Sequence, residues 1–230
     1  MLKDNLEQVI ANIKATCEKA NRSNDEVTLI AVSKTKPLSD IEELMTYGIC
    51  EYGENKVQEL VSKYENVSKP VRWHLIGHLQ TNKVKYIVDK AALIHSVDSV
   101  HLAKEIDKEA KKRNVVCDIL IQVNIAHEDT KFGINESEIY DFLDEIKDFS
   151  HIRVRGLMTI APFVENPEEN RLHFRNLYHL LLDIKSKNID NIDMSILSMG
   201  MTNDYMVAIE EGATMVRVGT GIFGERNYNI

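Results

Sequence analysis

The sequence predicts an α/β fold, a single (β/α)8 barrel of the TIM type that carries an extra helix at its N-terminus. Two observations support this prediction. Eight short apolar segments alternate with amphipathic segments at a fairly even spacing, which is typical of a parallel barrel. The 230 residues are also enough for one barrel, whereas a doubly wound sheet usually has fewer strands. We therefore expect one domain over residues 1–230, with no linker and no internal repeat.

The first elements can be placed from local patterns. A leading helix is predicted at residues 2–21, because apolar side chains recur there at steps of three and four. The first strand follows from Val27 and is almost entirely apolar, as expected of a strand buried on both faces. Pro37 cannot donate to a sheet ladder, so the strand should end ahead of it. Ser39 and Glu42 form a capping box, which predicts the start of the next helix.

The rest of the chain continues this alternation. Further strands are predicted at residues 49–53, 71–76, 93–97, 117–124, 154–158, 194–198 and 214–218. Helices with one apolar face are predicted from residue 54, from about residue 81, after residue 99, around residues 139–146 and 174–184, and over residues 202–211. A polar loop, residues 127–131, follows the fifth strand. The C-terminal ends of all eight strands should meet at one edge of the barrel.

The composition is ordinary for a soluble globular protein, with 43% apolar and 28% charged residues. A net charge of −8 argues against binding to a nucleic-acid backbone. The N-terminus lacks the apolar core of a signal peptide, and no segment approaches the roughly 20 apolar residues of a membrane span. Cys17, Cys50 and Cys117 form no C-x-x-C pair and lie in apolar surroundings, which suits reduced thiols in the core. We expect a cytoplasmic monomer that binds neither nucleic acid nor membranes.

Lys34 follows the first strand directly, at the edge where barrels and open α/β sheets bind their ligands. Burial and a neighbouring cation such as Lys36 would both favour the neutral amine. A neutral amine at this place can form a Schiff base with an aldehyde. On this segment alone, a solvated lysine just past a strand is an equally good interpretation.

Two glycine-containing segments lie after the seventh and eighth strands. The first includes Ser198, Met199 and Gly200 and precedes a predicted helix, and the second includes Gly219 and Thr220. Barrels commonly bind phosphate between these two loops, through free amides and the positive end of a helix dipole. Either segment alone could simply end a strand. Because both occur in adjacent positions facing Lys34, they favour a phosphate site.

Arg217 is flanked by apolar residues in a predicted buried strand, so its guanidinium must face a polar group. That group could be a structural ion-pair partner or a ring nitrogen of a ligand. A Schiff-base lysine together with a phosphate site describes an aldehyde that carries a phosphate. Pyridoxal 5′-phosphate (PLP) has both groups.

The chain resembles the pyridoxal-phosphate homeostasis proteins, a YggS/PROSC-like family related to the barrel domain of alanine racemase. The resemblance extends from about residue 5 to residue 228. It is carried by the segments AVSKTKP (31–37), GEN (53–55), QE (58–59), HLIGHLQTNK (74–83), RGLM (155–158), SMGMT (198–202), VRVG (216–219) and IFG (222–224).

This resemblance implies that Lys34 forms the Schiff base and that Arg217 faces the pyridine nitrogen. It places Asn55 near the ring, and it lines the phosphate with Ser198, Met199, Gly200, Gly219 and Thr220. The family usually has serine where Thr202 stands, and the hydroxyl is retained. Lys36 and Lys83 resemble secondary lysines that serve cofactor release. No metal ligand and no catalytic residue is expected.

The resemblance further implies a PLP carrier that takes part in intracellular PLP homeostasis, with PLP-dependent apo-enzymes as recipients and no turnover of its own. The alternative is a PLP-dependent enzyme resembling an amino-acid racemase. A cationic Arg217 beside the ring nitrogen would weaken the ring as an electron sink, and racemisation needs an acid or base on each face of the α-carbon. A third interpretation, a barrel enzyme acting on a sugar phosphate, predicts no covalent adduct at Lys34.

Overall fold

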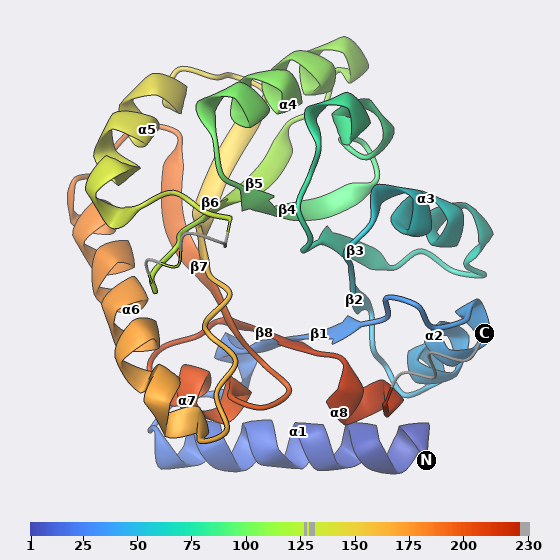
Figure 1. Cartoon of the computed structure of the whole chain (residues 1–230). Coiled ribbons are helices and arrows are strands. Elements are labelled where there is room, and N and C mark those ends of the chain that lie inside the picture. The colour runs from blue at the N-terminus through green and yellow to red at the C-terminus, as the bar shows by residue number, and fades with distance from the viewer. Residues whose placement is uncertain (127, 129–131, 226–230) are drawn as a thin grey trace.

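In the computed structural model, which describes residues 1–126, 128 and 132–225, eight parallel strands close into a barrel in the order β1 to β8. Figure 1 shows the helices arranged around the outside of these strands. The predicted barrel is confirmed. The strands are β1 Thr28–Val32, β2 Glu51–Glu54, β3 Arg72–Leu75, β4 Ala91–Val97, β5 Cys117–Gln122, β6 Ile152–Met158, β7 Ile192–Met201 and β8 Met215–Val218. The polar loop predicted at residues 127–131 lies, except for residue 128, outside the described residues.

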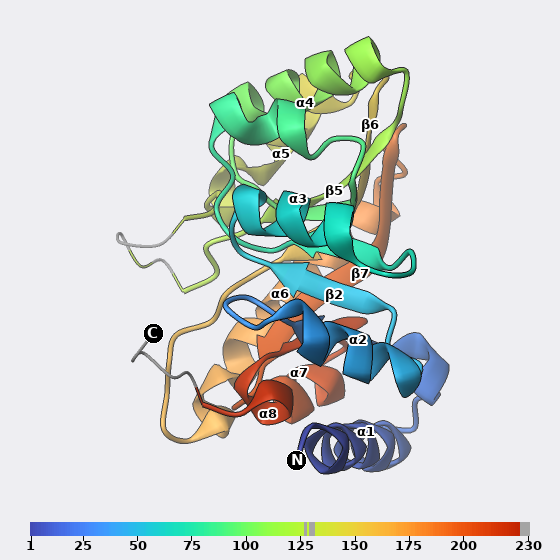
Figure 2. The ribbon, with the colours of Figure 1, turned by 90° about the vertical axis from the view of Figure 1, so that its right-hand side faces the viewer.

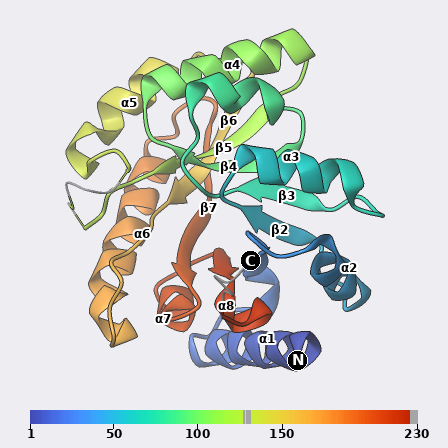
Figure 3. The same cartoon turned by 45° about the vertical axis from the view of Figure 1, so that its right-hand side comes forward.

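Helices connect the strands on the outside of the barrel. The α-helices are α1 Leu2–Lys19, α2 Leu38–Thr46, α3 Val57–Asn66, α4 Val100–Arg113, α5 Ile139–Ile146, α6 Arg171–Ser186, α7 Tyr205–Glu210 and α8 Thr220–Phe223. The 3-10 helices are η1 Asn24–Glu26, η2 Thr81–Tyr86, η3 Glu136–Glu138 and η4 Pro167–Asn170. The extra N-terminal helix, α1, packs against α7 and α8, which Figures 1 and 3 show lying beside it.

Several predicted boundaries are wrong for identifiable reasons. The expected helix from residue 81 is the short 3-10 helix η2, which ends at Tyr86 and buries Val84. The helix α2 begins at Leu38, because Pro37 already has the extended backbone of a cap, so Ser39 lies inside the helix and does not cap it. Cys50 lies ahead of β2 and is exposed, whereas the other two cysteines are buried as predicted.

The β7 strand is longer than predicted and extends to Met201. The segment expected to be a glycine turn after the strand, residues 198–200, therefore lies within it. The following helix, α7, begins only at Tyr205. The sequence predicts the strand end too early because the pattern of serine, glycine and threonine in this segment is also typical of a turn.

The core has two layers, as a closed barrel requires. A small cluster fills the barrel interior, and it consists of Ile30, Leu93, Leu120, Met158 and Met215 with Ile196 packed against it. A larger cluster lies between the strands and the surrounding helices. Neighbouring residues of a strand point to opposite layers. This alternation decides which polar side chains face the interior and which face the helices.

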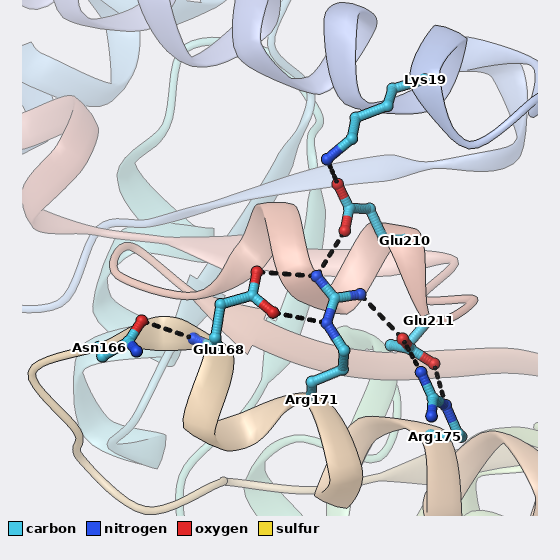
Figure 4. A network of polar contacts seen from close by, with 7 residues as sticks. All are labelled: Lys19, Asn166, Glu168, Arg171, Arg175, Glu210 and Glu211. Atoms are coloured by element: carbon cyan, nitrogen blue, oxygen red, sulfur yellow. Dashed lines mark hydrogen bonds and ion pairs between the residues drawn. The ribbon is translucent and has the colours of Figure 1, made fainter.

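A network of ion pairs joins α1, α6 and α7 on the outside of the barrel (Figure 4). Arg171 pairs with three carboxylates, those of Glu168 at 2.6 Å, Glu210 at 2.6 Å and Glu211 at 2.9 Å. Lys19 extends the network from α1 to Glu210, and a second arginine of α6 pairs with Glu211. We call this set of six residues the outer network: Lys19, Glu168, Arg171, Arg175, Glu210 and Glu211. None of the described helices is both long enough and apolar enough to cross a membrane.

Candidate functional site

Lys34 lies just beyond the C-terminal end of β1, at the position that the sequence predicts. β1 ends at Val32, Ser33 is fully buried, and Lys34 is half-buried in a tight turn. The amide of Lys36 closes this turn by donating to the Ser33 carbonyl oxygen at 3.0 Å. Thr35 has a φ of 64°, a left-handed conformation that is unusual for a β-branched residue. The backbone on the C-terminal side of Lys34 is therefore strained.

Side chains from β2 and α3, which lie beside each other in Figure 2, support this turn. Glu54 is fully buried, and its Oε1 accepts hydrogen bonds from Ser33 Oγ at 2.6 Å and Lys63 Nζ at 2.7 Å. Lys63 Nζ also donates to the Ser33 carbonyl oxygen at 2.7 Å and to Glu59 Oε1 at 2.8 Å. The amide of Thr35 donates to Glu59 Oε1 at 2.6 Å. We call Ser33, Glu54, Glu59 and Lys63 the Lys63 cluster.

Arg217 lies in β8, which is hydrogen-bonded to β1 with Ile30 opposite Arg217. Its side chain is buried, and the residue is only 3% exposed. Its Nη1 donates to Ser198 Oγ at 2.6 Å and its Nη2 to the Thr159 carbonyl oxygen at 2.8 Å. Burial lowers the pKa of Arg217 to about 10, and the charge of Asp204 acts in the opposite direction. The guanidinium therefore stays cationic at neutral pH while its hydrogen bonds go to uncharged oxygens.

A line of hydrogen bonds continues from Ser198 through the barrel interior to Glu51. His95 Nδ1 lies 3.0 Å from Ser198 Oγ, His95 Nε2 lies 2.8 Å from His74 Nδ1, and His74 Nε2 lies 2.6 Å from Glu51 Oε2. Burial, followed by the charges of His74 and Arg217, lowers the pKa of His95 well below its usual value.

One end of this line is an ionised carboxylate. Burial alone would raise the pKa of Glu51, but its contacts with His74 and Arg72 lower it overall. The ionised carboxylate accepts from His74 Nε2. The two imidazoles join this carboxylate to the Ser198 hydroxyl, and the Ser198 oxygen accepts from Arg217.

The turns after β7 and β8 meet at Thr202. Its Oγ1 accepts hydrogen bonds from the amides of Gly219 and Gly221, both at 3.3 Å. A Cβ on Gly219 would lie 3.5 Å from the carbonyl oxygen of Val32 in β1. The two turns are therefore adjacent, as predicted, and the second lies against the end of the strand that precedes Lys34. Because Thr202 accepts from these two amides, its own hydroxyl hydrogen and the remaining backbone amides are the donors that this edge offers to an anion.

The segment 198–200 contributes less to such an anion site than the sequence predicts. The Ser198 hydroxyl is bonded to Arg217 and His95, and the Met199 side chain is fully buried between the strands and the helices. Gly200 has a φ of 88° within β7, which glycine adopts readily. From this segment, backbone groups remain the candidate contacts.

Asn55 and the two secondary lysines lie at different parts of the same edge. Asn55 connects β2 to α3, and the backbone of Gly77 packs so closely on it that a Cβ would lie 2.3 Å from the Asn55 carbonyl oxygen. Lys36 Nζ donates to the Phe223 carbonyl oxygen at 2.9 Å, which ties the β1 turn to α8. Lys83 lies in η2. Nothing in these contacts tests a role in cofactor release, which stays a prediction.

Residues 5–227 match the family model for the alanine racemase N-terminal domain. Among curated relatives, the chain is 45% identical to the pyridoxal phosphate homeostasis protein of Aquifex aeolicus, over 98% of both chains. No group of three or more ligating side chains that could hold a metal occurs within the described part of the chain.

Solved structures with the same fold include several at more than 30% identity. An unknown protein from Bifidobacterium adolescentis is 32% identical, with a TM-score of 0.92, over 96% of this chain and 94% of that one. The structure of PipY from Synechococcus elongatus with PLP bound is 31% identical, with a TM-score of 0.82, over 93% of this chain and all of that one.

Proposed function

Because the chain belongs to the pyridoxal phosphate homeostasis proteins, within the alanine racemase N-terminal domain family, we propose that it holds PLP covalently on Lys34. One observation carries this proposal. Lys34, the buried Arg217 and the glycine turn after β8 all lie at the ends of β1 and β8, two hydrogen-bonded neighbours in the barrel. PLP bound to PipY, a relative with the same fold, supports the same ligand for this chain.

The residues at this edge fit the functional groups of PLP. PLP supplies an aldehyde for imine formation with an amine, and a phosphate that amides can bind. Lys34 would supply the amine for this imine, and the aldehyde oxygen would leave as water with the two amine hydrogens. The Thr202 hydroxyl and those amides of the β8–α8 turn that do not donate to Thr202 would hold the phosphate. Asn55 contributes to the ring site from the end of β2.

Arg217 favours a carrier over an enzyme. A guanidinium whose pKa is about 10 keeps its proton at neutral pH, so facing the ring nitrogen, as the family resemblance implies, it would donate to that nitrogen and leave it unprotonated. An unprotonated ring is a weaker electron sink for carbanion chemistry.

We therefore propose that the protein keeps PLP and supplies it to apo-enzymes in the cytoplasm. We further propose that it acts as a monomer. In light scattering we expect the mass of one chain.

Racemase-like activity is the second candidate, because the family model is that of an alanine racemase domain. The test is exchange of the α-hydrogen of amino acids in deuterated water with PLP-saturated protein. A carrier gives no exchange above that of PLP alone. Exchange that depends on the protein and is lost in a Lys34→Met variant would favour the enzyme.

Covalent binding is tested by adding PLP and then dialysing. We expect the wild-type protein to stay yellow and Lys34→Met to lose its colour, with Lys69→Met, which changes an exposed lysine, behaving as wild type. A Lys34→Met protein that stays fully yellow after dialysis would contradict the proposal. A wild-type protein that never turns yellow would instead favour a sugar-phosphate ligand.

A further inference from the structure

Lys63 is a buried lysine whose hydrogen bonds converge on the turn that contains Lys34. Its side chain is 9% exposed. The three hydrogens of its ammonium match three oxygen acceptors, the Ser33 carbonyl at 2.7 Å, Glu54 Oε1 at 2.7 Å and Glu59 Oε1 at 2.8 Å. A buried ammonium is costly unless it is paired and hydrogen-bonded. A lysine that served only the solubility of the helix surface would be exposed, so the burial of Lys63 needs another explanation.

The Lys63 cluster contacts the backbone on both sides of Lys34. The Ser33 carbonyl belongs to the peptide group that precedes Lys34, and it accepts from Lys63 Nζ. The Thr35 amide belongs to the peptide group that follows Lys34, and it donates to Glu59 Oε1. The Ser33 hydroxyl is held in turn by Glu54. Both peptide groups that flank the Lys34 Cα are thus fixed by side chains of β2 and α3.

These contacts hold the strained backbone at Thr35 in its conformation. A β-branched residue at a φ of 64° is strained and persists only where its surroundings impose this conformation. The hydrogen bond from the Thr35 amide to Glu59 is such a constraint. Without it, the turn can relax, and the direction in which the Lys34 side chain leaves the backbone changes. Imine formation requires the amine and the aldehyde to be aligned within a fraction of an ångström.

We propose that Lys63, with Glu54 and Glu59, positions Lys34 for covalent capture of the PLP aldehyde by clamping the two peptide groups that flank it. These are positioning residues that act through the backbone of the turn. The inference rests on the proposed function, because it assumes that Lys34 forms the covalent bond. It assigns the Lys63 cluster to bond formation and leaves recognition of the phosphate and ring to the β7 and β8 edge.

The test compares two ligands that differ only at the reacting carbon. PLP has an aldehyde, whereas pyridoxine 5′-phosphate has an alcohol there and cannot form an imine. Affinities are measured for the wild type, Lys63→Met, Glu59→Ala and Glu59→Gln, with Glu65→Ala as the matched control. Glu65 is exposed on the same helix. The glutamine variant keeps an oxygen that can accept the Thr35 amide hydrogen.

We expect Lys63→Met and Glu59→Ala to weaken PLP binding by about tenfold or more, because small misplacements of reacting groups have large effects. Binding of pyridoxine 5′-phosphate should be unchanged, Glu59→Gln should recover most of the loss, and Glu65→Ala should match the wild type. Equal losses for both ligands, or no loss for either, would overturn the inference. If Lys63→Met does not fold, the Glu59 variants decide.

Failure of the proposed function has a different signature. If the wild type itself binds the aldehyde no more tightly than the alcohol and gains no colour, Lys34 forms no covalent bond, and the inference about the Lys63 cluster falls with it. If the wild type prefers the aldehyde and the variants keep that preference, only the inference is overturned.

Discussion

The outer network and the Lys63 cluster are both built from lysine or arginine and glutamate, but they differ in burial and in what they hold. The outer network is partly exposed and joins helices to one another (Figure 4). The Lys63 cluster contains a fully buried carboxylate, Glu54, and holds the turn around Lys34. The comparison indicates that each exposed ion pair stabilises the fold by a small amount, whereas a buried ion pair is suited to holding one local geometry.

One carboxylate from each set shows an opposite pKa shift. Burial raises the pKa of Glu54, and attraction to Lys63 offsets only part of the rise. Hydrogen bonds from Arg175, and then from Arg171, lower the pKa of Glu211 despite partial burial. As pH rises, ionisation of Glu54 therefore lowers the stability of the fold, whereas ionisation of Glu211 raises it.

The largest effect on stability is expected for Glu54→Ala. This change leaves Lys63 buried without its main partner, and breaking a buried pair costs about 3–5 kcal/mol. We expect a loss of about 3 kcal/mol in the free energy of unfolding, because Glu59 still pairs with Lys63. Denaturant titration measures it. A loss below about 1 kcal/mol, the range of an exposed pair, would contradict the distinction between the two sets.

A smaller effect is expected for Arg171→Ala, which removes the centre of the outer network. Exposed pairs contribute about 0.2–1 kcal/mol each, so a loss of about 1–2 kcal/mol is expected at low salt. Repeating the titration at high salt should reduce the difference, since salt screens exposed charges. A salt-independent loss as large as that of Glu54→Ala would show that the network behaves as a buried one.

The smallest effects are the opposite pH dependences of two glutamine variants. Glu54 has a raised pKa in the folded state, so its ionisation destabilises the protein as pH rises from about 4.5 through the folded-state pKa. Glu211 has a lowered pKa, so its contribution is full above about 4.5 and is lost as pH falls through the folded-state value.

Unfolding of the wild type, Glu54→Gln and Glu211→Gln over this pH range measures both. The stability of the wild type relative to Glu54→Gln should fall with rising pH, and its stability relative to Glu211→Gln should rise. Slopes of the same sign for the two pairs would contradict the assigned directions.

The barrel and the position of Lys34 could be predicted because their signals are local. Apolar runs mark each strand, and Lys34 follows one of them directly. The predicted ends of β7 and α2 are wrong because one local signal has two interpretations. Gly200 can lie in a turn or within a strand, and Ser39 can cap a helix or lie inside it. The assignments of individual residues to PLP stay predictions.

The supporting residues could not be predicted, because their contacts arise only when the barrel closes. Lys63 reaches Ser33 across 30 residues of sequence, and that contact depends on how α3 packs against β2. His95 meets Ser198 only because β4 and β7 both face the same interior. A single histidine in an apolar strand does not indicate that it takes part in a line of hydrogen bonds through the barrel interior. The sequence places Glu54 at the start of the next helix, whereas in the structure it is the last residue of the buried strand β2.

The central claim is that the Lys34 amine carries PLP, and reduction with borohydride followed by peptide mapping tests it most directly. Reduction converts the imine into a stable amine, so the pyridoxyl group stays on the lysine that held it. The account predicts that the label is on the peptide containing Lys34. A label found instead on Lys36, Lys63 or Lys83, or the absence of any label in protein that has turned yellow, would contradict it.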